Sequence, residues 1–117
     1  MDERLSQALE FSNYITTINN QKRMIKETYF QSLLYFVQGG QFTITKELIT
    51  FVTLLVEKGN IENIILVDDN DIPIQIDDLE LFLEQVLSKY FETANNYHQK
   101  YTELAKNRDI GSLVNND

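Results

Sequence analysis

The fold is decided by residues 61–84, which read Ile61-Glu-Asn-Ile-Ile-Leu-Val-Asp-Asp-Asn-Asp-Ile-Pro-Ile-Gln-Ile-Asp-Asp-Leu-Glu-Leu-Phe-Leu-Glu84. Two β-branched runs, 63–67 and 72–76, flank the turn-rich Asp68-Asp-Asn-Asp71, and this pattern predicts an acidic β-hairpin over residues 63–76. Pro73 has no backbone N–H to give to a neighbouring strand. We therefore expect the second strand at a sheet edge, or Pro73 on its solvent side.

The same stretch carries the net charge of the protein. Residues 61–84 hold eight acidic side chains and no basic one, whereas acids and bases balance in the rest of the chain, so this stretch accounts for the whole charge of −8. An acidic chain of this kind disfavours nucleic acid as a direct partner, because phosphate binding needs clustered Lys and Arg. The one basic cluster is Lys22, Arg23 and Lys26, which we interpret first as a solvated helix face.

A long helix is expected after the hairpin, over residues 78–107, with a tail at 108–117. Asp77 has the position of an N-cap, and Glu80 completes the spacing of a capping box. Apolar and aromatic side chains recur at helical spacing, which predicts a coiled-coil-like seam; they are Leu83, Val86, Tyr90, Ala94, Tyr97, Tyr101 and Leu104.

Residues 3–37 are expected to form another long helix, because no Pro or Gly occurs before Gly39-Gly40. Its seam is nearly heptad and has one polar interruption; the members are Ala8, Phe11, Ile15, Ile18, Lys22, Ile25, Tyr29, Leu33 and Phe36. Asn19-Asn20 could mark a break in its middle, since Asn competes for backbone hydrogen bonds.

Between these parts, residues 41–45 are predicted to form a short strand, with Thr45 as the cap of a helix at 46–57. That run is apolar on nearly every side, which is typical of a buried helix. A strand stays the alternative, because the run is rich in Ile, Thr, Phe and Val. Gly59 stands where a helix commonly ends.

The fold predicted for residues 1–117 is a single α+β domain, mainly helical, with a small two- or three-stranded sheet. The two long helices could pair as an antiparallel helical hairpin, and each is far longer than the mean of about 11 to 12 residues. Tyr90, Tyr97 and Tyr101 line the second half of the last helix, which suits a partly hydrated contact surface. We therefore expect a homo-oligomer, most simply a dimer.

Catalytic and metal sites find little support in the sequence. The chain has no Cys and a single His, and a lone histidine without a nucleophile or a second ligand is a poor catalyst. Asp69, Asp71 and Glu80 match three positions of a calcium loop, but Pro73 stands where a ligand is required. We expect no enzyme, no bound metal and no cofactor. The acidic start and the absence of a long apolar run predict no secretory leader and no membrane span.

Three stretches, residues 1–14, 39–49 and 65–74, together resemble a set of small uncharacterised proteins of T-even-type bacteriophages of marine cyanobacteria and related hosts. The likeness covers most of the chain and carries over no site residues. It implies a phage protein that acts in the cytoplasm of an infected bacterium or is associated with the virion.

The sequence thus favours a non-enzymatic interaction or assembly module that presents Asp68, Asp69 and Asp71 to a basic surface of a phage or host protein. The alternative is an accessory factor in phage nucleic-acid metabolism, in which Lys22, Arg23 and Lys26 contact phosphate. A third possibility is that the acidic stretch only confers solubility.

Overall fold

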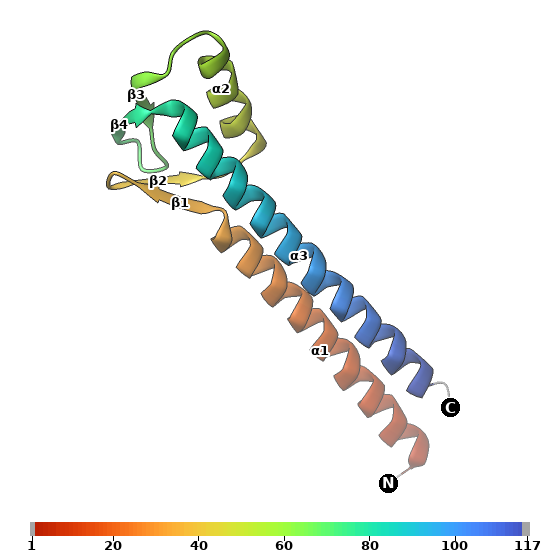
Figure 1. Cartoon of the computed structure of the whole chain (residues 1–117). Helices are drawn as coiled ribbons and strands as arrows, with labels where there is room; N and C mark the ends of the chain where they lie inside the picture. The colour runs from red at the N-terminus through yellow and green to blue at the C-terminus, as the bar shows by residue number, and fades with distance from the viewer. Residues whose placement is uncertain (1, 116–117) are drawn as a thin grey trace. The chain divides into compact units, whose positions relative to one another are not determined.

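The computed structural model describes the backbone of residues 2–115 and the side chains of residues 2–106 (Figure 1). It confirms a mainly helical α+β protein with long N- and C-terminal helices. The elements are α1 (Glu3–Ser32), β1 (Leu34–Val37), β2 (Gly40–Thr43), α2 (Lys46–Glu57), β3 (Glu62–Val67), β4 (Pro73–Asp78) and α3 (Leu79–Asn115). None of the described helices is long and apolar enough to cross a membrane.

Contacts within the chain group it into two compact units. The helical unit takes in residues 1–29 and 95–117, and the hairpin unit takes in residues 30–94. A single domain over residues 1–117 stays a prediction.

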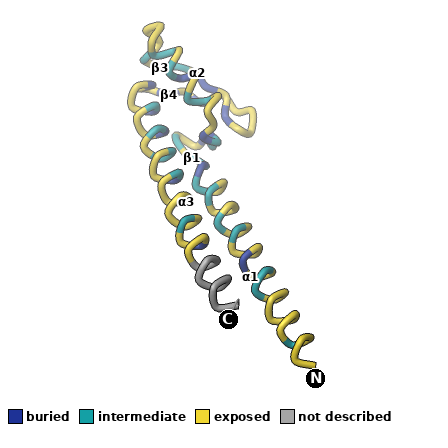
Figure 2. Tube along the Cα trace, turned by 90° about the vertical axis from the view of Figure 1, so that its right-hand side faces the viewer, coloured by how far each residue is buried: buried dark blue, intermediate teal, exposed yellow. Residues whose placement is uncertain are grey.

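The helical unit is an antiparallel pair made by α1 and α3. The rings of Tyr29 and Tyr97 meet edge to face, with centroids 4.6 Å apart. Ile18 on α1 and Leu104 on α3 are buried, and half-buried positions recur between Ile15 and Tyr29 at the predicted spacing (Figure 2). The helix runs through Asn19-Asn20 without a break.

The hairpin unit holds most of the buried apolar side chains. Phe82 of α3 is buried there, in edge contact with Tyr35 of β1 and Phe42 of β2 at centroid distances of 5.6 and 5.4 Å. Around them are buried Leu33, Ile44, Val52, Leu66, Ile74, Ile76, Leu79 and Val86. Two antiparallel two-stranded sheets, β1–β2 and β3–β4, frame this core.

The prediction that the first helix reaches residue 37 is wrong. It ends at Ser32, and residues 34–37 form β1, which pairs with β2 so that Tyr35 lies opposite Phe42. The turn between them has positive φ at Gln38 and Gly39, 47° and 78°. Aromatic and β-branched residues suit a half-buried strand. For residues 34–37, the pairing with β2 outweighs the helical propensity of the segment.

The strand predicted at residues 41–45, which is β2 in the structure, is also shifted from its predicted range. It occupies Gly40–Thr43 and not 41–45, because Thr45 belongs to the helix start. As predicted, the Thr45 Oγ1 accepts a hydrogen bond from the N–H of Leu48 at 3.0 Å. Gly59 follows the helix end with a φ of 87°, which an L side chain rarely adopts.

Residues 46–57 form a helix, as predicted, and not a strand, but the expectation that it is buried is wrong. Of its side chains only Val52 is fully buried, while Phe51 and Leu54 are 51% and 49% exposed. The helix packs against the hairpin unit through one face only. Its other apolar face is uncovered by the described residues of this unit.

The start and the end of α3 both differ from the prediction. Asp78 caps it in place of Asp77, since β4 continues through Asp78, whose Oδ1 accepts from the N–H of Leu81 at 3.1 Å. The helix continues to Asn115, so the predicted tail at 108–117 is wrong as far as residue 115, and residues 116–117 lie outside the described residues. One Gly costs a helix only about 1 kcal/mol, which does not end it.

Candidate functional site

The predicted β3–β4 hairpin is confirmed, and its acidic turn is built around Asp68. Asp68 is only 5% exposed, and its Oδ1 accepts hydrogen bonds from the N–H groups of Asn70 and Ile72 at 2.9 and 2.8 Å. Its Oδ2 accepts from the N–H of Gln41 in β2 at 3.0 Å. The N–H groups of Gln41 and Ile72 hold the pKa of the Asp68 carboxyl below its ordinary value, because they stabilise the charged form.

Asp69 completes the junction with β2. Its N–H donates to the carbonyl of Gln41 at 2.8 Å. Its carboxylate accepts from the N–H and the hydroxyl of Thr43 at 3.1 and 2.6 Å, and from the side-chain amide of Gln41 at 3.2 Å. The two aspartates therefore occupy the edge of β2 that faces away from β1, as a neighbouring strand would.

This geometry distinguishes the three aspartates that the sequence analysis expected to be presented to a basic partner. Asp68 is an internal anchor, and Asp69 is exposed but engaged at the strand edge. Asp71 differs from both, since it is exposed with a φ of 61° and no partner among the described residues is recorded for its carboxylate. Of the three predicted contact residues, Asp71 alone leaves its carboxylate unengaged for a partner.

No family model, curated protein or solved structure matches this chain. Apolar surfaces are left uncovered in both units.

An apolar face on β3 is the first of these surfaces. Ile64 and Leu66 point towards the core of the hairpin unit, while Ile65 and Val67 are 55% and 63% exposed. The strict alternation of a strand places them together on the opposite face. Sequence reasoning identified the strand but missed this face, although its period of two was visible once the strand was assigned.

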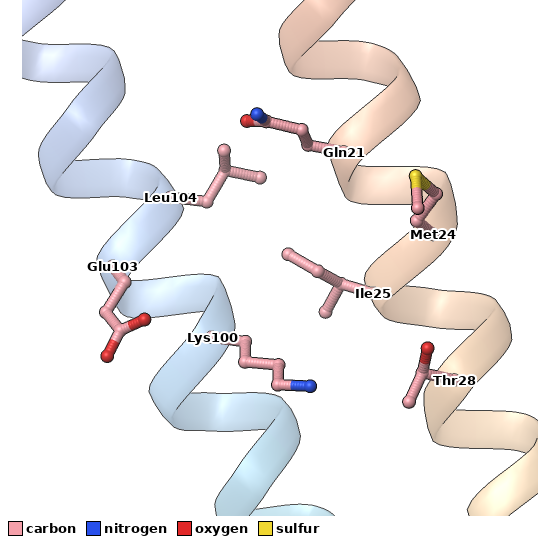
Figure 3. Close-up of a pocket in the computed structure, with 7 residues that line it drawn as sticks. All are labelled: Gln21, Met24, Ile25, Thr28, Lys100, Glu103 and Leu104. Carbon is pink, nitrogen blue, oxygen red and sulfur yellow. The ribbon is translucent and has the colours of Figure 1, made fainter.

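A groove along the helical unit is the second surface. It encloses about 440 Å³ between α1 and α3, with Ile25 and Leu104 among its apolar lining residues (Figure 3). The remaining lining residues are Gln21, Met24, Thr28, Lys100 and Glu103. Met24 is 62% exposed. Met24 was not among the predicted seam residues, because it lies off the stripe that pairs the two helices.

The three tyrosines proposed as partner contacts fall in different surroundings. Tyr97 is half-buried against Tyr29 and stands 6.3 Å from the ring of Tyr101. Tyr101 is exposed, whereas Tyr90 is half-buried in the hairpin unit beside Phe91. Tyr97 thus serves the helix pair itself, and Tyr101 is the tyrosine best placed for an external contact.

The basic cluster of α1 is partly engaged within the helical unit. Lys22 is half-buried and lines a small pocket with Tyr101 and Leu104. Arg23 forms a long ion pair with Glu27, at 3.8 Å between Nε and Oε1. Lys26 is exposed. The three side chains therefore do not form one free basic face.

Metal-ligating side chains do not cluster in the described part of the chain. Among those residues, no three His, Cys, Asp or Glu side chains gather where they could hold a metal ion. Burial raises the pKa of Tyr35, whose hydroxyl donates to the Oε1 of Gln85. This pair joins β1 to α3 at the edge of the core.

Proposed function

We propose that the protein is a non-enzymatic interaction module that self-associates through its helical unit and carries an acidic hairpin for a basic partner. The observation that carries this proposal is the thin core of the helical unit. Among its described side chains only Ile18 and Leu104 are fully buried, although α1 spans 30 residues. A helix pair with so little burial is marginal by itself, since helices gain most of their stability from tertiary packing.

A second copy is the simplest cover for the groove. Two antiparallel pairs that pack groove to groove would bury Met24 and Ile25 in a four-helix arrangement, in which each helix contributes a seam. The mixed lining supports self-association further, because Lys100 and Glu103 on one wall are of opposite sign and can meet their counterparts across a two-fold axis.

Light scattering during gel filtration tests this proposal. The expected mass at micromolar concentration is twice that of one chain, and dilution should shift it towards the monomer. Met24→Glu should favour the monomer, because it places a charge in the buried interface. Asn19→Glu is the matched control: it adds the same charge to an exposed position of α1 outside the groove, and its mass should equal that of the parent. A monomer at all concentrations contradicts self-association.

On the resemblance alone, we further propose that this module acts in the cytoplasm of a phage-infected bacterium or with the virion, in assembly or on a host complex. A pull-down from infected cells would identify the partner.

The alternative, an accessory role in nucleic-acid metabolism, would use Lys22, Arg23 and Lys26. A gel shift with DNA separates the two functions. The interaction module predicts no retention, whereas phosphate contacts predict binding that weakens steeply as salt rises.

A further inference from the structure

The hydrogen-bond pattern of the β3–β4 hairpin leaves one edge of β3 open. Asp68 donates its N–H to the carbonyl of Ile72 at 2.9 Å, so hydrogen-bonded pairs recur at every second residue from there. Ile65 opposite Gln75 and Val67 opposite Pro73 are then the pairs without ladder bonds. The N–H and C=O groups of Ile65 and Val67 therefore point away from β4.

Nothing within the described chain meets this edge. No backbone or side-chain hydrogen bond joins Ile65 or Val67 to any other described element, and both residues are exposed. Ile65 and Val67 lack most of the devices that usually protect an edge, since β3 contains neither Pro nor Lys and its one charged residue is Glu62 at its start. The one irregularity of β3 is Asn63, whose φ of 53° interrupts the pairing with β4 on the N-terminal side of these two residues.

The neighbouring strands differ from β3 in this respect. The outer edge of β2 is satisfied by Asp68 and Asp69, as described above. The outer edge of β4 carries Pro73, which has no N–H, and it ends in Asp77-Asp78. Of the strands in the two sheets, β3 is the longest whose outer edge is both unsatisfied and apolar.

The negative charge around β3 favours a basic strand as the binding partner of this edge. Residues 61–84 contain eight acids and no base. Glu62 begins β3, and Asp69 lies two residues after its last residue; both are exposed, although the Asp69 carboxylate already accepts hydrogen bonds from Thr43 and Gln41. Pairing of β3 with β3 of a second copy would bring two such stretches together, which like charges oppose. A strand with Lys or Arg beside its apolar residues meets the same edge with charges that attract.

We propose that β3 binds an extended, basic segment of a partner protein by strand addition. Backbone hydrogen bonds to Ile65 and Val67 would hold the segment, its apolar residues would cover the exposed face of those two side chains, and its basic residues would lie near Glu62 and Asp69. This inference rests on the proposed function as an interaction module and names the chemistry of the partner.

Synthetic peptides of about nine residues test this inference, because a strand of that length covers β3 with its flanks. One peptide alternates Val with Lys, and its matched control alternates Val with Glu. We expect the Lys peptide to bind at least about tenfold more tightly than the Glu peptide at low salt, and the difference to shrink as salt rises. Hydrogen exchange should show new protection of the Ile65 and Val67 amides when the Lys peptide is bound.

Proline variants locate the site. Val67→Pro removes an N–H from the outer edge of β3 without breaking a hydrogen bond between β3 and β4. It should lower the affinity for the Lys peptide by about tenfold or more. Gln75→Pro removes an N–H from the outer edge of β4, together with the hydrogen bond that the Gln75 side chain donates to Asn63 at 3.1 Å, and it should leave the affinity for the Lys peptide near that of the parent. Val67→Lys is a second edge variant, which does not constrain the backbone, and it should also lower the affinity for the Lys peptide. Circular dichroism verifies that each variant is folded.

The inference is overturned by no binding of the Lys peptide, by equal binding of the Glu peptide, or by protection that falls on amides other than those of Ile65 and Val67. Protection of these two amides in the purified protein, lost on dilution, also overturns it and assigns the edge to a second copy. Mass and peptide binding are separate readouts. A monomer that binds the peptide defeats only self-association, and a dimer that does not bind it defeats only this inference.

Discussion

The carboxylate of Asp68 accepts a hydrogen bond from the backbone N–H of Gln41, which lies 27 residues earlier in the chain. This contact joins the β3–β4 turn to the edge of β2, and Asp69 reinforces it through Thr43. The most acidic part of the chain therefore has a structural role within the hairpin unit, whether or not a partner is bound. The residues left for a partner are those beside the junction.

Asp68→Asn should destabilise the protein more than Asp71→Asn does. An Asn at position 68 can keep the bonds from Asn70 and Ile72 through its one carbonyl oxygen, but its amide group then faces the N–H of Gln41, and donor meets donor. Asp71 is exposed and no such bond is recorded for its side chain. Urea denaturation at neutral pH measures the difference, and equal midpoints for the two variants would contradict the anchoring role.

The pKa of Asp68 also sets a pH dependence. Because its folded-state pKa lies below the ordinary value of 3.8, the charged carboxylate contributes stability that is fully present above that value. This contribution is lost as the pH falls below 3.8 through the folded-state pKa. The difference in urea midpoint between the parent and Asp68→Asn should therefore narrow from about pH 7 to about pH 3. A constant difference would show that the charge has no part in the anchor.

Gly40→Ala should be destabilising through a close approach to Ile74. A Cβ at Gly40 would stand 2.6 Å from the Cγ1 of Ile74, which is buried and has little room to move. Overpacking of this kind costs about 1 to 3 kcal/mol. The double variant with Ile74→Ala should lose less stability than the sum of the two single variants, since the clash is then absent. Additive losses in thermal or urea unfolding would rule out this contact.

Thr45→Ala should cost about 1 kcal/mol of stability, because it removes the N-cap of α2. Thr50→Ala is the matched control. Thr50 is exposed within the same helix, where its hydroxyl bonds only to the carbonyl of Lys46, and Ala is the better helix former. We expect Thr50→Ala to be neutral or slightly stabilising in urea titrations, and a loss equal to that of Thr45→Ala would discount the cap.

A double-variant cycle on Tyr29 and Tyr97 tests the antiparallel pairing of α1 with α3. Edge-to-face rings at 4.6 Å should couple by about 0.5 to 1.5 kcal/mol beyond the apolar area they bury. Tyr29→Leu and Tyr97→Leu, alone and together, keep an apolar side chain at each position while removing the rings, and the cycle subtracts the apolar area that each single variant loses. Zero coupling in denaturant unfolding would mean that the two rings do not meet in solution.

Local signals in the sequence determined several elements correctly. Thr45 and Gly59 bounded α2 at residues 46–57, and the β-branched runs around the acidic turn gave the β3–β4 hairpin. The heptad spacing from Ile15 to Tyr29 identified the face that pairs with α3. These features depend on neighbours within a few residues, so propensity, capping and periodicity are sufficient to find them.

Tertiary structure alone decided the rest. Residues 34–37 follow a helical pattern in the sequence and become β1 only because β2 lies beside them. The burial of Asp68, which composition alone would place in solvent, depends on the N–H of Gln41 far away in the chain. Strand pairing and long-range hydrogen bonds add free energy that no local window contains, and that free energy determines which side chains are engaged inside the protein and which are left to meet a partner.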